Sequence, residues 1–439
     1  MENVKADLQR IPDYRLFGRV TAIQGLLVEV AGIERHVSVG SDCRLLARDR
    51  EVAAEVVGFR DNRTLLMPFS AVDGLGLGSR AIVAEHDPVV YPDSSWLGRV
   101  VNAMGTPVDG HGSIKRGLDA YPLRAAPPQA NARSRVVGKI DLGVRSINTF
   151  QSCCRGQRMG IFSGSGIGKS ILLSMMAKNT QADVNIIGLV GERGREVKEF
   201  IEDYLGKEGM QRSVVVVATS DESALMRRQA AYLTLTLAEY FRDLGLDVLC
   251  LMDSVTRFAM AQREIGLSSG EPPASKGYTP TVFSELPRLL ERAGTGTGDG
   301  TITGLFTVLV EGDDHNEPIA DAVRSILDGH IVLDRSIAER GRYPPVNVLR
   351  SVSRTMPDCN TDEENALIDR ARQLISAYED MAEMIRLGAY RIGSDPRVDE
   401  AIAYREVLEA FLSQDKDEPC SLEDGYAQLA QIFAAGDAE

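Results

Sequence analysis

The chain has 439 residues, 44% of them hydrophobic, and its 63 acidic and 49 basic residues give a formal net charge of −14. This length predicts about two or three folded domains, and the acidic balance disfavours a nucleic-acid partner, because phosphate backbones bind basic surfaces. Six cysteines without C-x-x-C spacing indicate neither a zinc site nor a disulfide framework, and no stretch is apolar enough for a membrane span or a signal sequence, so we expect a protein of the reducing cytosol.

The N-terminal region predicts a short helix followed by a small barrel. In residues 1–15, Val4, Leu8 and Ile11 recur at helical spacing, but so short a helix must dock on something to persist, and a frayed terminus is the alternative. In residues 16–91, β-rich runs such as FGRVTAIQGLLVEVAG and EVAAEVVGF recur between Gly, Asp and Asn turns. This pattern is typical of a β-barrel domain.

Residues 92–348 predict an α/β domain. After a Pro/Ala-rich loop over 122–135, nearly continuous apolar strands alternate with helical segments, which indicates a parallel sheet covered on both faces. The expected strands are RMGIFS, DVNIIGLVG, SVVVVATS, DVLCLMD, GLFTVLVEG and VNVLR.

Residues 349–439 predict a helical domain. Thr361 and Glu364 form a capping-box pattern, and a helix is expected from there until Gly388 stops it. Apolar residues recur along this helix at alternating spacings of four and three, so one face packs against the rest of the protein. They are Leu367, Ala371, Leu374, Tyr378, Met381 and Ile385.

The run FSGSGIGKS (162–170) lies between an expected strand and an expected helix. In that setting backbone N–H groups and a helix N-terminus converge on an anion, so the loop predicts a phosphate cradle in which Lys169 reaches the terminal phosphates and Ser170 coordinates Mg²⁺. Ser163 departs from the strict pattern, which has glycine there, so the assignment rests on G-x-G-K-S. The predicted nucleotide-binding residues of the loop are Gly164, Ser165, Gly166, Ile167, Gly168, Lys169, Ser170 and Ile171.

Two carboxylates follow neighbouring strands. Asp253 ends DVLCLMD, where it suits a group that orients the water shell of Mg²⁺ at the carboxyl edge of the sheet. Glu192 follows another strand and reaches the same edge, where it could polarise a water for attack on the γ-phosphate. From spacing alone, a turn aspartate and a solvated charged loop remain alternatives.

Longer motifs carry a family resemblance. They are GSGIGKS, GLVGERGREVKEFIE, LMDSVTRFAMAQREIGL, GEPPASKGYTPTVFSELPRLLERAG, EGDDHNEPIADAVRSILDGHIVLDR and RYPPVNVLRSVSR. Over nearly its whole length the chain resembles the catalytic β subunits of rotary ATP synthases and, more closely, the ATPases of type III secretion in the branch that powers flagellar protein export. The branch assignment depends mainly on IRLGAYRIGSDPRVDEAI (385–402). The resemblance implies a RecA-like P-loop domain between a β-barrel and a C-terminal helical domain.

The resemblance also implies roles for the charged residues. Glu192 matches the carboxylate that activates the attacking water, and Arg193 matches a basic neighbour near the γ-phosphate. Glu196 matches an outer-shell acid near Mg²⁺, and Asp253 matches the aspartate that orients the metal. Lys169 completes this predicted catalytic set.

Two further roles come from the resemblance. Tyr343 matches an aromatic that packs on adenine, although in GRYPP it could equally be a turn tyrosine. Where rotary members place a second aromatic this chain has Lys416, so a two-sided aromatic clamp is not expected. Arg354 matches the arginine finger that reaches a neighbouring subunit's nucleotide, and its plain alternative is a surface salt-bridge partner.

The implied activity is Mg²⁺-dependent hydrolysis of ATP to ADP and phosphate in the cytoplasm, by a homohexamer at the base of the flagellar export gate, peripheral to the inner membrane. The implied partners are a FliH-like regulator bound partly through residues 1–15, a FliJ-like central stalk, membrane proteins of the gate, and export substrates with their chaperones. Nucleic acid is not expected.

Three alternatives stay open. An injectisome ATPase is the nearest. A noncatalytic nucleotide-binding ring subunit is a second, but such subunits have glutamine where this chain has Glu192. A hexameric RNA translocase is a third, and the acidic charge and the missing aromatic and basic pattern in residues 16–85 count against it.

Overall fold

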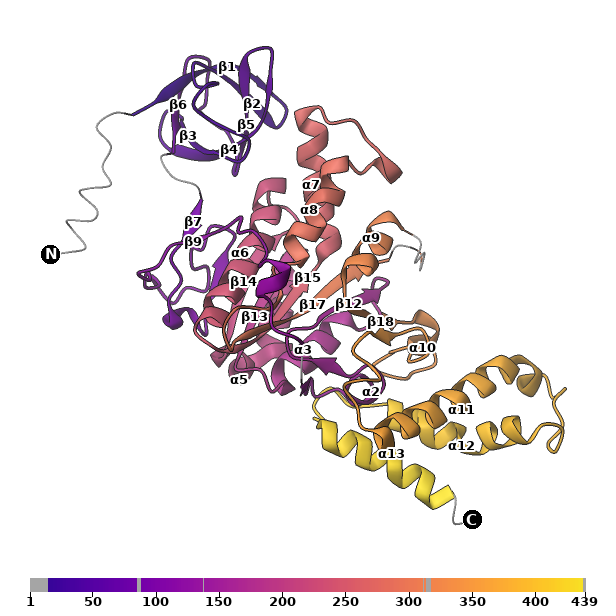
Figure 1. Ribbon diagram of the computed structural model, residues 1–439. Coiled ribbons are helices and arrows are strands. Elements are labelled where there is room, and N and C mark those ends of the chain that lie inside the picture. The colour runs from indigo at the N-terminus through magenta and orange to yellow at the C-terminus, as the bar shows by residue number, and fades with distance from the viewer. Residues whose placement is uncertain (1–14, 85–87, 137, 311, 313–316, 437–439) are drawn as a thin grey trace.

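The computed structural model describes residues 15–84, 88–136, 138–310, 312 and 317–436. It contains a barrel at one end, a central domain built on a largely parallel sheet, and a group of helices at the other end (Figure 1). This order confirms the predicted fold class. The N-terminal helix expected over residues 1–15 lies outside the described residues, except for Arg15, which is not helical. No helix in the described ranges is both long and apolar enough to cross a membrane.

The N-terminal barrel is closed, with strand order β1-β2-β5-β4-β3-β6. Alternate residues of β1 point inward, so Val20 is buried while its neighbours in the strand are exposed. Gly18 is required here because a Cβ at this position would lie 2.5 Å from Val30 Cγ1. The strands are β1 (Phe17–Gln24), β2 (Leu27–Ala31), β3 (Asp42–Leu46), β4 (Glu51–Arg60), β5 (Arg63–Pro68) and β6 (Arg80–Val83).

The central sheet has strand order β19-β18-β12-β17-β15-β13-β14-β8, and the pairs from β18 to β8 are parallel. A short strand, β16, pairs antiparallel with β17. The strands are β8 (Val100–Asn102), β12 (Arg158–Ser163), β13 (Val184–Glu192), β14 (Ser213–Thr219), β15 (Asp247–Asp253), β16 (Gly294–Thr295), β17 (Thr301–Leu309), β18 (Gly329–Leu333) and β19 (Val352–Ser353).

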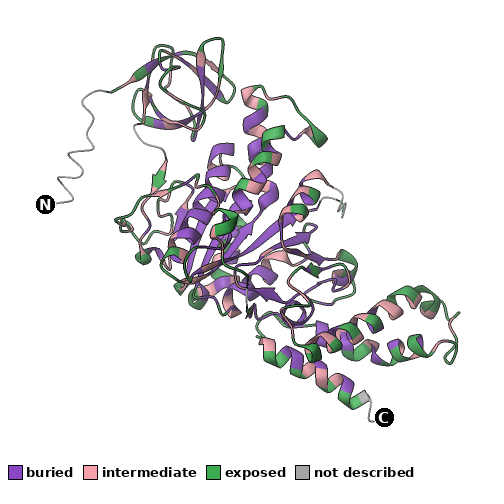
Figure 2. Cartoon of the chain, viewed as in Figure 1, coloured by how far each residue is buried: buried purple, intermediate pink, exposed green. Residues whose placement is uncertain are grey.

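Helices cover both faces of this sheet, and its strands are buried (Figure 2). Successive strand residues therefore enter two different cores: Ile161 and Ile187 lie in one, and Phe162 and Ile186 in the other. The first core contains α3 and helices of the C-terminal domain, and the second contains α6 to α9. These helices are α3 (Lys169–Asn179), α6 (Ala224–Asp243), α7 (Val255–Ser269), α8 (Pro280–Leu290) and α9 (Pro318–Ile326).

One expected strand is wrong. VNVLR (346–350) makes only an isolated bridge, between Val346 and Leu333, and then turns, because the Asn347 side chain accepts hydrogen bonds from the N–H groups of Leu349 and Arg350. Such side-chain capping of the backbone favours a turn over a strand. The strand beside β12 is instead β18 (Gly329–Leu333), from the run GHIVL.

The C-terminal domain consists of α11 (Asp362–Arg386), α12 (Pro396–Leu412) and α13 (Leu422–Gly436). The predicted capping box is confirmed, since Thr361 and Glu364 exchange side-chain to backbone hydrogen bonds. Ala371 and Leu374 from the predicted apolar face are buried, whereas Leu387 beyond the end of α11 is exposed. These helices therefore have buried residues close to the central domain and mostly exposed residues toward the turn between α11 and α12 (Figure 2).

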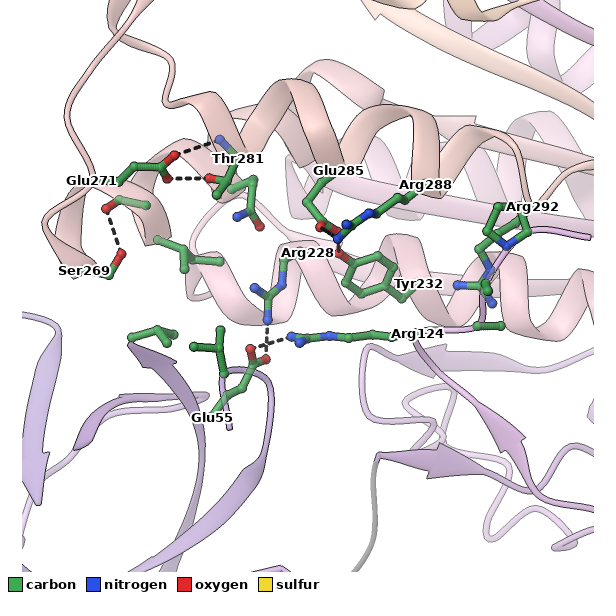
Figure 3. A pocket seen from close by; sticks show the side chains of 18 residues that line it. Glu55, Arg124, Arg228, Tyr232, Ser269, Glu271, Thr281, Glu285, Arg288 and Arg292 are labelled. Carbon is green, nitrogen blue, oxygen red and sulfur yellow. Dashed lines mark hydrogen bonds and ion pairs between the residues drawn. The ribbon is translucent and has the colours of Figure 1, made fainter. Parts of the chain in front are cut away.

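A buried carboxylate joins the barrel to the central domain. Glu55 of β4 is 2% exposed and forms ion pairs with Arg124 of the linker and Arg228 of α6 (Figure 3). A cavity of about 470 Å³ lies beside these groups, between the barrel and α6 to α8.

We expect Glu55→Ala to lower the free energy of unfolding by about 3 kcal/mol, because it leaves two arginines at a buried junction without their carboxylate. Calorimetric unfolding measures the loss. Glu51→Ala is the matched control on the same strand: its pair with Arg44 is exposed and should be worth less than about 1 kcal/mol. Equal losses in the two variants would contradict the role of Glu55.

Candidate nucleotide-binding site

The glycine-rich loop joins β12 to α3 at the carboxyl edge of the sheet. Gly166 and Gly168 have φ angles of 76° and 89°, in the left-handed region that favours glycine. Ser163 ends β12 in ordinary strand conformation, which explains why serine is accommodated where the strict pattern has glycine. Gly168 caps α3, so the helix presents its first N–H groups directly after the loop, as an anion site requires.

Lys169 lies between the two predicted carboxylates. Its ammonium forms an ion pair with Asp253 and lies 3.6 Å from Glu192 Oε1. All three side chains are at least 85% buried, with 11%, 5% and 15% of their areas exposed. Burial acts to lower the pKa of Lys169, but the charges of Asp253 and Glu192 outweigh it, and the pKa is raised. The structure therefore brings these three sequence-predicted residues together.

Glu192 is largely buried and lies close to other charged side chains. Burial, followed by the negative charge of Asp253, raises its pKa to about 7, which is the range of a general base at neutral pH. Within the part of the chain that the structure describes, its buried Oε1 atom has no hydrogen-bond partner. This orphaned oxygen, next to a lysine and an aspartate, is chemically suited to hold a water in a site for a phosphate and a divalent cation.

Arg193 and Glu196 lie at the beginning of α4 (Gly194–Glu199). The Glu196 carboxylate also contributes to the raised pKa of Glu192, so it borders the site. The Arg193 side chain is 82% exposed and pairs with Glu196 at 3.7 Å. Glu196 thus lies beside the predicted base, and Arg193 extends into solvent.

Tyr343 lines a small pocket beside the loop. A Cβ on Gly168 would lie 3.5 Å from the Tyr343 ring, and Tyr343 itself is 48% exposed. The pocket has a volume of about 200 Å³. Lys416 of the C-terminal domain also lines it, and this is the position at which the sequence predicted no second adenine-facing aromatic. The other lining residues are Ile171, Leu172, Met175, Pro344, Pro345, Gln414 and Asp415.

Arg354 lies far from the loop of its own chain. Ser353 pairs with Gly329 at the beginning of β18, and the Arg354 N–H donates to Asp328 O at 2.9 Å. The phosphate loop instead follows Ser163, which pairs with Leu333 at the end of β18. Arg354 is therefore at the amino edge of the sheet, opposite the loop, and it is exposed.

Two residues in the site were missed from the sequence. Thr307 of β17 donates a hydrogen bond to Asp253 Oδ1 at 2.7 Å, and Arg335 donates to the carbonyl of Ser165 in the loop at 3.1 Å. A hydroxyl within the otherwise apolar run GLFTVLV was a usable signal for Thr307. Nothing in the sequence singled out Arg335.

We expect Thr307→Val to weaken Mg²⁺-dependent binding of ATP about tenfold, because Asp253 loses a donor that fixes its orientation. Titration of a fluorescent ATP analogue with and without Mg²⁺ measures the difference. Thr307→Ser keeps the hydroxyl and should restore binding. If Thr307→Val leaves the Mg²⁺ dependence unchanged, the hydrogen bond has no role in orienting Asp253.

Comparisons with known proteins cover nearly the whole chain. Three family descriptions match: the beta-barrel domain of the ATP synthase alpha/beta family over residues 20–82, its nucleotide-binding domain over 143–353, and the T3SS EscN ATPase C-terminal domain over 360–431. The "Flagellum-specific ATP synthase" of Caulobacter vibrioides is 58% identical, and the alignment covers 99% of each chain.

Solved structures show the same similarity. The assembled ATPase EscN of the enteropathogenic E. coli type III secretion system superposes with a TM-score of 0.89 at 38% identity, covering 94% of this chain and 99% of that one. EscN in complex with its central stalk EscO gives a TM-score of 0.87 at 37% identity, with the same coverage.

Proposed function

The chain belongs to the ATP synthase alpha/beta family, and we propose that it hydrolyses ATP in the cytoplasm to energise the export of flagellar proteins. Its full-length similarity to flagellum-specific and type III secretion ATPases makes it an ATP-hydrolysing enzyme. The observation that supports the site best is the convergence of Lys169, Asp253 and Glu192 beside the glycine-rich loop. The identity of 58% to a flagellum-specific relative, against 45% to a type 3 secretion system ATPase, favours the flagellar branch over the injectisome alternative.

The roles of the site residues follow from their positions. Lys169 would exchange its carboxylate partners for the terminal phosphates of ATP, and the loop N–H groups would hold the same phosphates. Ser170 and Asp253 would hold Mg²⁺, with Glu196 in its outer shell. The ion would neutralise charge on the phosphates. Arg193 would approach the γ-phosphate.

Glu192 would act on the attacking water. Its Oε1 has no hydrogen-bond partner among the described residues, so it can accept a hydrogen bond from water and then take the proton as the water oxygen attacks the γ-phosphorus. Tyr343 would pack on one face of adenine, and Lys416 leaves the other face without an aromatic.

The proposed assembly is a homohexamer at the export gate, peripheral to the inner membrane. Arg354 lies at the sheet edge opposite its own loop, and this position supports the proposal that it serves a neighbouring site. A FliJ-like central stalk is proposed by similarity to EscN with EscO. The exposed Leu387 and Ile392 between α11 and α12 offer it an apolar contact. Gate membrane proteins, export substrates and chaperones complete the proposed partners, without nucleic acid.

Two measurements test the proposal, one on the purified protein and one in a strain that carries a variant. Purified protein should release phosphate from ATP in the presence of Mg²⁺, and a strain that carries only Glu192→Gln should fail to secrete flagellar proteins. Normal secretion by that strain would contradict the export role. Stimulation of the ATPase by RNA would instead favour a translocase.

Glu192 also argues against the noncatalytic alternative, because ring subunits that bind nucleotide without hydrolysis have glutamine there. Measured turnover by the isolated protein would exclude that class.

We expect deletion of residues 1–15 to leave basal ATPase activity largely intact and to weaken binding of a FliH-like regulator. The apolar Val4, Leu8 and Ile11 would provide the docking face, and none of the site residues described above lies in this segment. A pull-down with the regulator measures binding. Substitution of Val4, Leu8 and Ile11 by serine in the full-length chain should weaken binding as the deletion does, and unchanged binding would refute the assignment.

A further inference from the structure

The loop after α12 forms one wall of the small pocket beside Tyr343. Gln414, Asp415 and Lys416 of this loop line the pocket. Asp415 and Lys416 are exposed, whereas Gln414 is only 5% exposed, so Gln414 is the residue that anchors the wall in the protein. Its backbone N–H donates a hydrogen bond to the Tyr343 carbonyl at 2.8 Å. This bond joins the loop directly to the segment that carries the aromatic ring.

The side-chain amide of Gln414 joins the same loop to the central domain. Its Oε1 atom accepts a hydrogen bond from the Arg145 N–H at 2.8 Å, and its Nε2 atom donates to the carbonyls of Gly143 at 2.9 Å and Glu418 at 2.6 Å. Among uncharged side chains, only glutamine and the shorter asparagine provide an acceptor and two donors at once. The amide therefore uses its oxygen and both of its N–H groups in this one position.

Arg145 holds the end of α12 against the same part of the central domain. This residue begins α2 (Arg145–Phe150), and its guanidinium donates to the carbonyls of Phe411 at 3.1 Å and Ser413 at 3.0 Å. It also forms an ion pair with Glu418. The last carbonyls of a helix lack partners within the helix, so a cation at this end stabilises it. The loop after α12 is thus held at both of its ends.

Gly143 lies against the helix that follows the glycine-rich loop. Its φ angle is 70°, and a Cβ at this position would lie 2.1 Å from the Cβ of Asn179, the last residue of α3. Residues of α3 also line the pocket, namely Ile171, Leu172 and Met175. The pocket therefore has one wall on α3 and another on the loop after α12, and Gln414 ties the second wall to a segment that packs on the first.

We propose that Gln414 is a positioning residue for the nucleobase, and that it sets the part of the ATP affinity that comes from the base. This role rests on the proposed function, in which Tyr343 packs on adenine. The four hydrogen bonds of Gln414 hold the Tyr343 segment and the loop after α12 in place, whereas the phosphates would bind at Lys169 and the N–H groups of the glycine-rich loop. Loss of the Gln414 amide should therefore weaken contacts with the base and leave contacts with the phosphates intact. A residue that only supported the fold would affect both parts of the nucleotide alike.

The experiment compares two ligands of the full-length protein, ATP and inorganic tripolyphosphate, each with Mg²⁺. Tripolyphosphate carries the phosphates without the base. In Gln414→Glu the carboxylate can still accept from the Arg145 N–H, but an oxygen replaces the donor that faces two carbonyls. We expect calorimetric titration to show a roughly tenfold rise in the Kd for ATP and no change for tripolyphosphate. In steady state, KM should rise with kcat unchanged, which is the pattern when an interaction made equally in the ground state and the transition state is lost.

Two further variants make the result decisive. Gln414→Met keeps the approximate size of the side chain without adding a charge, and it should lower the affinity for ATP in the same selective way. Gln373→Glu makes the same chemical change as Gln414→Glu at an exposed position of α11 and should leave the binding of both ligands unaffected. Unchanged ATP affinity in either Gln414 variant, or an equal loss of affinity for both ligands, would overturn the proposed role of Gln414. If the unaltered protein bound neither ligand, the proposed nucleotide site itself would be refuted.

Discussion

Replacing Glu192 with glutamine is expected to leave ATP binding intact and to lower kcat by about 10²–10⁴-fold, the usual contribution of a general base. The amide keeps the shape of the side chain but cannot accept the proton of the attacking water. Lys169→Ala should differ, because the lysine would contact the phosphates in both the ground state and the transition state. It should abolish turnover and also weaken ATP binding.

The two phenotypes separate in a pair of measurements, equilibrium binding of a fluorescent ATP analogue and steady-state release of phosphate. Glu202→Gln is the control: this carboxylate lies ten residues after Glu192, is 62% exposed and pairs only at the surface with Lys198. It should keep both binding and turnover. Near-normal turnover by Glu192→Gln would show that another group activates the water.

Arg354→Ala and Lys169→Ala are each expected to be inactive alone and to regain activity when mixed. The proposed finger would stabilise the transferring phosphoryl group in a neighbour's site, an effect worth about 10³–10⁵ in rate in other nucleotide hydrolases. Arg354→Ala subunits keep an intact loop, and Lys169→Ala subunits keep an intact finger. In mixed assemblies some intact loops face intact fingers.

The mixing experiment needs proof that subunits exchange, from cross-linking or native mass measurement. Arg350→Ala is the matched control, since Arg350 lies four residues upstream and reaches Asp334 of its own chain at 3.8 Å. It should remain active alone. Mixed assemblies that form and stay inactive would remove the main support for action between subunits, and full activity of Arg354→Ala alone would refute the finger.

Prediction of the structure from the sequence was most accurate where a single local signal determines the structure. Long apolar runs ending in a carboxylate placed Asp253 and Glu192 at one sheet edge, because parallel strands bring their carboxyl ends together. The capping box fixed the beginning of α11, since Thr361 and Glu364 satisfy each other's backbone groups locally. The roles assigned to these site residues remain predictions.

Prediction of the structure from the sequence was less accurate where contacts between distant segments determine the structure. VNVLR and GHIVL have similar composition, and the capping of two N–H groups by Asn347 excludes the first from the sheet. Thr307 and Asp253 are 54 residues apart and meet only because β15 and β17 are neighbours. The packing of Lys169 between two carboxylates likewise depends on the strand order.

The placement of the loop and Arg354 on opposite edges of one sheet constrains how copies can associate. A contact that joins the carboxyl edge of one copy to the amino edge of the next is head-to-tail, and repetition of it either closes a ring or extends an open helical filament. With Arg354 in its proposed role as a finger, the terminal copies of an open array leave one loop without a finger and one finger without a loop. Activity per subunit should therefore be absent in the monomer, rise with array length, and reach its maximum only when the array closes.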